Sequence, residues 1–125
     1  MRADDSPGTK TESEAVGPVD LTHLRQYTLG DRDLEREILG LFADQLLVTI
    51  DALKDAPSDK EWTIAAHTLK GSARAVGAWS LARLAESAEK LRGLSDVDER
   101  NAVVRGLEEA ALEARTYISS LSRAA

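Results

Sequence analysis

The chain has 125 residues, the size of a single domain, and 42% of them are hydrophobic, which is enough for a core. Only 4% are aromatic, so the core must consist mainly of Leu, Ala, Val and Ile side chains. The lack of cysteine excludes disulfides and thiolate metal sites, and the formal net charge of −6 disfavours nucleic acid and anionic lipid as partners. No apolar run approaches the ~20 residues of a membrane span, so we expect a cytoplasmic protein with no membrane partner.

The first 18 residues are rich in Ser, Thr, Pro, Gly and charge, which predicts a disordered tail over residues 1–18 and a folded domain over residues 19–125. A short helix is expected from Asp20, its N-cap, to about Thr28. Gly30 is suited to the left-handed conformation that commonly ends a helix.

A long helix is expected from Asp31, its N-cap, to about Asp55. Its apolar residues follow helical spacing, and they are Leu34, Ile38, Leu41, Phe42, Leu46, Ile50 and Leu53. Leu39 and Leu47 widen this face. The helix is therefore expected either to pack on two sides or to leave an apolar strip for a partner.

Three further helices complete the pattern. Ser58 and Glu61 form a capping box ahead of a helix that ends at Gly77. The next helix is expected over about 79–92, and the last from Ser95, its N-cap, to about Ser122. The apolar stripe of this last helix reads Val97, Val104, Leu107, Ala111, Ala114, Ile118 and Leu121. The predicted fold is all-α, an antiparallel four-helix bundle with a short additional N-terminal helix.

The helix before Gly77 has two distinct faces. Its core stripe comprises Trp62, Ala65, Leu69, Ala73 and Val76. His67 lies roughly 150° from the centre of that stripe, which predicts an exposed ring. The residues that share this outer side are Thr63, Ile64, Lys70, Gly71 and Arg74.

The outer face suits a phosphoryl group. Gly71 costs ~1 kcal/mol relative to Ala inside a helix, but it leaves space one turn from His67. Lys70 and Arg74 offer cationic donors, and we expect no acid beside the ring. A free imidazole is mostly the neutral nucleophile near pH 7. No carboxylate cluster for a metal ion is evident beside His67, so neither a metal nor another cofactor is expected to bind to the chain itself.

The stretch from His67 to Ala73, followed by Gly77, resembles the signature of histidine-containing phosphotransfer (HPt) domains. The resemblance implies that His67 is the phosphoacceptor and that Lys70 supports the phosphoryl group electrostatically. It implies that Gly71 permits close approach of a receiver domain, and that Gly77 closes the helix. The partners implied are response-regulator receiver domains, which bring the acceptor aspartate and Mg²⁺.

The sequence thus predicts a phosphorelay intermediate that exchanges a phosphoryl group between His67 and the aspartate of a receiver domain. Thr63, Ile64, Ser72 and Arg74 are expected to contribute to docking. A hybrid histidine kinase is one candidate source of the receiver, and the chain is expected to act as a monomer. No Gly-rich nucleotide loop is present, so no kinase or ATPase activity is expected. The alternatives are a helical adaptor that binds receivers without carrying phosphate, and a purely structural bundle, which would leave Gly71 unexplained.

Overall fold

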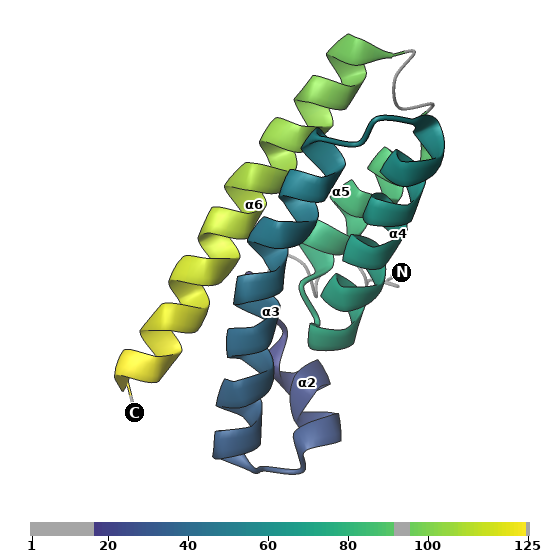
Figure 1. The fold of residues 1–125 in the computed structure, drawn as a ribbon. Helices are drawn as coiled ribbons and strands as arrows, with labels where there is room; N and C mark the ends of the chain where they lie inside the picture. The colour runs from purple at the N-terminus through teal and green to yellow at the C-terminus, as the bar shows by residue number, and fades with distance from the viewer. Residues whose placement is uncertain (1–16, 92–95, 125) are drawn as a thin grey trace, which may run out of the picture.

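The computed structural model describes residues 17–91 and 96–124. Over these ranges the secondary structure is entirely helical: α2 (Leu21–Thr28), α3 (Arg32–Lys54), α4 (Asp59–Val76), α5 (Trp79–Lys90) and α6 (Val97–Ala124). The predicted all-α class is confirmed. Helices α3 to α6 alternate in direction and form the bundle, while α2 lies against one end of α3 (Figure 1). Of the tail expected over residues 1–18, residues 1–16 lie outside the described residues, as do the expected end of a helix at Arg92 and the expected N-cap at Ser95.

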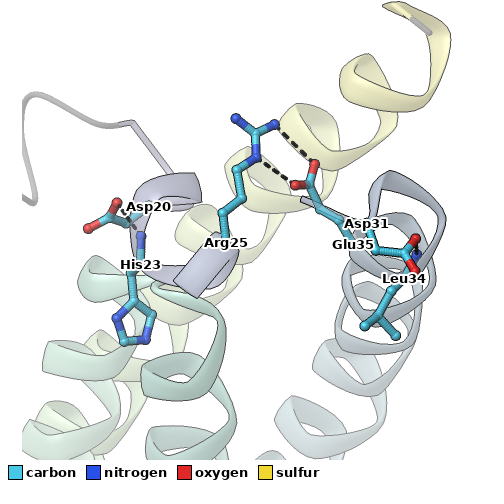
Figure 2. A network of polar contacts seen from close by, with 6 residues as sticks. All are labelled: Asp20, His23, Arg25, Asp31, Leu34 and Glu35. Carbon is cyan, nitrogen blue, oxygen red and sulfur yellow. Dashed lines mark hydrogen bonds and ion pairs between the residues drawn. The ribbon is translucent and has the colours of Figure 1, made fainter. Parts of the chain in front are cut away.

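The short helix α2 begins and ends where predicted, but its left-handed C-cap starts one residue before Gly30. The Asp20 carboxylate accepts a hydrogen bond from the backbone N–H of His23 at 3.1 Å, as an N-cap should (Figure 2). The C-cap is Leu29, which has a φ of 54°, and Gly30 follows with a φ of 87°. The left-handed turn thus occupies two residues, and the 85% exposed Leu29 side chain points into solvent.

A bidentate ion pair holds α2 against α3. Arg25 donates from Nε to Glu35 Oε1 at 2.6 Å and from Nη2 to Oε2 at 3.2 Å (Figure 2). Glu35 is buried, and its hydrogen bonds from Arg25 lower the pKa of the carboxyl group below its ordinary value. Asp31, the predicted N-cap of α3, accepts a hydrogen bond from the backbone N–H of Leu34 at 3.0 Å. The corner between α2 and α3 is therefore held by the Arg25–Glu35 pair and by this cap.

The buried face of α3 is rotated from the predicted one. The α3 side chains in the core are Leu39, Phe42, Leu46, Ile50 and Leu53. Leu34 and Leu41, which were predicted to face inward, are 39% and 61% exposed. Because α3 packs on both α4 and α6, its buried arc centres on Leu46, and Leu41 falls outside that arc. Helix α3 thus packs on two sides, which was one of the two predicted alternatives, and Leu41, Leu47 and Val48 remain exposed.

The antiparallel pair α4 and α5 is anchored near both of its ends. Trp62 is completely buried, and its indole N–H donates to the carbonyl oxygen of Ala88 at 2.7 Å. At the other end, the indole N–H of Trp79 donates to Asp20 Oδ2 at 3.0 Å, and the Asp20 backbone N–H donates to the Gly77 carbonyl oxygen at 2.9 Å. Asp20 therefore caps α2 and ties it to the turn between α4 and α5.

The stripe predicted for α6 is correct except at its start. Val104, Leu107, Ala111, Ala114 and Ile118 are buried, and Leu121 is partly buried against the core. Val97 is 50% exposed, because the first turns of α6 extend beyond the end of α3 (Figure 1). No helix in the described ranges has the length and apolar character needed to cross a membrane.

Candidate functional site

The outer face of α4 presents the predicted side chains to solvent. The whole predicted core stripe of α4 is buried: Trp62, Ala65, Leu69, Ala73 and Val76. On the opposite side the His67 ring is 67% exposed. The residues exposed around it are Thr63, Ile64, Gly71, Ser72 and Arg74. Lys70 differs from these, because only 16% of its side chain is exposed.

An acid lies beside the histidine, contrary to the prediction. Glu89, from α5, places Oε2 at 2.9 Å from His67 Nδ1 and Oε1 at 2.6 Å from Lys70 Nζ. One carboxylate therefore bridges the ring and the lysine. A looser pair follows one turn further on, where Arg74 Nη2 lies 3.9 Å from Glu86 Oε1.

Glu89 could not be predicted from the pattern of α4 alone, because it belongs to α5. Helices α4 and α5 run antiparallel, so residue numbers rise along one helix as they fall along the other. Glu86 and Glu89 are three residues apart, hence on one face of α5, and the basic residues Lys70 and Arg74 share one face of α4. Matching these two charged faces across the hairpin is the signal that would have identified Glu89.

The electrostatics of this network define the state of the ring. Hydrogen bonds from Lys70 and then from His67 lower the pKa of Glu89 below its ordinary value, so Glu89 is a carboxylate at neutral pH. An ionised carboxylate only accepts hydrogen bonds. A neutral His67 ring in this contact must therefore carry its proton on Nδ1, which leaves the lone pair on Nε2.

Gly71, within α4, and Gly77, its C-cap, have different roles. A Cβ atom built on Gly71 would meet nothing within 4 Å, so the glycine leaves open space one turn from His67. Gly77 has a φ of 81°, and a Cβ there would lie 2.9 Å from both Cβ and the carbonyl oxygen of Asp20. Gly77 is thus required by its backbone conformation and by the close approach of Asp20.

A shallow apolar groove runs between α3 and α4 on the other side of His67. The residues that line it are Val48, Thr49, Ala52, Asp55, Ala56, Pro57, Glu61, Ile64, Ala65 and Thr68. Val48 and Ile64 are 61% and 54% exposed. Within the described residues, no three His, Cys, Asp or Glu side chains converge as a metal site would require.

The described residues thus form a helical bundle that presents His67, beside Lys70, on an open face of α4. The family model of the Hpt domain matches residues 36–123, and the chain belongs to this family. Its class is therefore histidine phosphotransfer in phosphorelays, a carrier rather than an enzyme in its own right. Neither the curated proteins nor the solved structures yielded a match.

Proposed function

We propose that the chain carries a phosphoryl group on Nε2 of His67 and exchanges it with the aspartate of response-regulator receiver domains. The observation that carries this proposal is the exposed ring, 67% accessible, whose Nδ1 is engaged by Glu89 while Nε2 stays free for attack. Family membership supports the phosphorelay setting. The half-buried His23 offers no such arrangement, because its ring packs against Tyr27 and Trp79.

Transfer requires in-line geometry and neutralisation of charge on the phosphoryl oxygens. Lys70, one turn from His67, is the cation placed to supply part of this charge. Its ammonium group is held by Glu89 before phosphorylation, and a dianionic phosphoryl group competes for it afterwards. Mg²⁺ and the acceptor aspartate belong to the receiver in this proposal.

The receiver is proposed to dock over α4 and the groove beside it. Gly71 and Ser72 keep side-chain bulk low next to the ring, and Thr63 and Arg74 add polar contacts at the edge. Ile64 and Val48 supply exposed apolar area at which water can be displaced. This surface combines a polar reaction centre with an apolar contact, as a specific but transient complex requires.

The experiment is transfer of label from a ³²P-phosphorylated receiver to the purified chain. Label should reach the wild-type chain in an acid-labile, base-stable form, as expected of a phosphoramidate. His67→Gln should accept none, and the matched control His23→Gln should accept label as the wild type does. Receiver binding without any transfer would instead identify an adaptor, and labelling of His67→Gln would refute the assigned residue.

A further inference from the structure

A cavity lies where the corner between α2 and α3 meets the last turns of α6. Its volume is about 150 Å³, and it shares no lining residue with the site around His67. Three arginines line it, Arg25 from α2 and Arg32 and Arg36 from α3, and the acid among its lining residues is Glu35. Three positive charges thus face one negative charge, in a chain whose formal net charge is −6.

The hydrogen-bonding capacity left in this cavity is that of donors. Both oxygens of Glu35 already accept from Arg25 (Figure 2). Arg36 donates from Nη2 to Asp33 at 2.6 Å, but the Asp33 side chain is 89% exposed, so water screens this pair. Arg32 makes no hydrogen bond or ion pair within the part of the chain that the structure describes. A guanidinium group has five N–H donors and no acceptor, so the cavity has spare donors for an anion.

Apolar side chains form the rest of the cavity wall. Leu39 and Ile118 are buried, and Leu121 is partly buried against the core. A cavity of this volume holds a molecule of about the size of benzene. Sites for small molecules combine such apolar walls with a few polar groups that fix the orientation of the ligand.

The geometry points to a binding site for a small organic anion, a phosphate or a carboxylate attached to a short apolar group. Its oxygens accept hydrogen bonds from Arg32 and Arg36, since guanidinium groups bind both kinds of oxyanion through paired donors. Arg25 stays on Glu35 and keeps the corner in place. The apolar group lies against Leu39. This site does not depend on the proposed function of His67.

The test is a titration of the unphosphorylated chain with phenyl phosphate and with benzoate, followed by NMR of the arginine Nε–H groups. Sodium chloride keeps the ionic strength constant, so that general screening does not change during the titration. The signals of Arg32 and Arg36 should move and saturate, with half-saturation at about 1 mM or lower for at least one probe. The probe that binds identifies the head group. Failure of both probes to saturate overturns the proposal.

Variants of the two α3 arginines locate the anion. Arg32 and Arg36 are exposed and hold no buried partner, so Arg32→Gln and Arg36→Gln should melt as the wild type does. Each should weaken binding about tenfold or more, in line with the strength of a hydrogen bond to a charged group. Arg105→Gln is the matched control, because Arg105 is exposed on α6 and does not line the cavity. Wild-type affinity in both α3 variants overturns the proposal.

The cations beside His67 are a competing site for an anion. Lys70→Met removes the cation nearest the ring, and the probe should still bind to it as tightly as to the wild type. If Lys70→Met loses binding while the α3 variants keep it, the anion lies beside His67 and the proposal is overturned. These titrations use neither a receiver nor a phosphorylated chain. Failure here therefore leaves transfer to His67 untouched, and failure of transfer leaves the titrations untouched.

The head groups alone test the apolar wall. Inorganic phosphate and acetate carry the same charged groups as phenyl phosphate and benzoate but lack the ring. Each should bind about tenfold or more weakly than its counterpart with a ring, because burial of the ring adds to the affinity. Equal affinity with and without the ring would place the anion on the open surface and overturn the proposed cavity.

Discussion

Gly71 is a residue whose structural and functional requirements conflict. It lies in the exposed middle of α4, with ordinary helical backbone and open space where a Cβ would be. Gly71→Ala should therefore raise the free energy of unfolding by about 0.5–1 kcal/mol, because Ala loses less backbone entropy in a helix. Urea denaturation measures this change. A glycine kept where Ala is more stable indicates that the space itself is used.

A larger side chain separates folding from transfer at the same position. Gly71→Gln should melt at nearly the wild-type temperature and yet transfer about 100-fold more slowly, because a misplacement of ~1 Å at the reacting atoms costs that much. Transfer at the wild-type rate would show that the glycine clears no docking path. If Gly71→Gln instead unfolded the chain, Gly71 would be a glycine required by packing, and the open space beside it would not be available to a side chain.

Gly77 should give the opposite outcome. Gly77→Ala should lower the free energy of unfolding by at least about 1–2 kcal/mol, the cost of a left-handed backbone for a residue with a Cβ. The new Cβ would also lie 2.9 Å from Cβ and the carbonyl oxygen of Asp20, which adds to that cost. Thermal melts of Gly71→Ala and Gly77→Ala side by side check the contrast, and equal stabilities would contradict it.

Which residues could be predicted follows from where their information lies. The exposure of His67 and the space at Gly71 follow from helical geometry within α4 alone, and the sequence supplied both. Glu89 enters the site through the register between α4 and α5, which no single-helix pattern contains. The low exposure of Lys70, 16%, also depends on Glu89 and could not be predicted from α4 alone.

At the scale of elements, the corner between α2 and α3 should be sensitive to acid. The pKa of Glu35 is lowered in the folded chain, first by its hydrogen bonds from Arg25 and against the opposing effect of burial. A lowered folded pKa means that the pair contributes stability above the unfolded value, 4.5, and that this contribution is lost as pH falls through the folded pKa. Glu35→Gln should be less stable than wild type near pH 7 by about 1–2 kcal/mol and lose less on acidification.

Urea denaturation at about pH 7 and about pH 3 measures both differences. Glu37→Gln is the matched control, because Glu37 lies exposed on the same helix. It should follow the wild type at both pH values. An acid loss as large in Glu35→Gln as in the wild type would contradict the assignment of this carboxylate.

Helix starts were predicted well because caps are local. Asp20, Asp31 and Ser58 each accept the expected backbone hydrogen bond. Faces were predicted less well. Leu41 and Val97 are apolar and correctly spaced, yet exposed. Leu41 lies outside the arc of α3 that α4 and α6 cover, and Val97 lies where α6 extends beyond the end of α3.

For the molecule as a whole, receiver binding should depend on the apolar groove between α3 and α4. Ile64→Glu puts a charge at the centre of the proposed contact, where the native side chain is 54% exposed. The receiver concentration for half-maximal transfer should rise about tenfold or more, since placing an unpaired charge in an interface costs more than 1.4 kcal/mol. The maximal rate should change little, because His67 and its partners remain in place.

Leu112→Glu on α6 is the matched control, because Leu112 is even more exposed, at 65%. Titration of transfer rate against receiver concentration compares the two variants. An unchanged titration for Ile64→Glu, or an equal effect of Leu112→Glu, would move the docking surface away from this groove.

The two tryptophans provide intrinsic fluorescent reporters at opposite ends of the α4–α5 pair. Trp62 is completely buried at the Ala88 end of the α4–α5 pair, while Trp79 is partly exposed and bonded to Asp20 at the other end. In Trp62→Phe the remaining indole is Trp79, whose emission would report on the attachment of α2 through Asp20. In Trp79→Phe the remaining indole is Trp62, whose emission would report on the core near Ala88. Comparing the emission of the two single-tryptophan variants with and without receiver shows whether binding changes the structure at one end of the α4–α5 pair or at both.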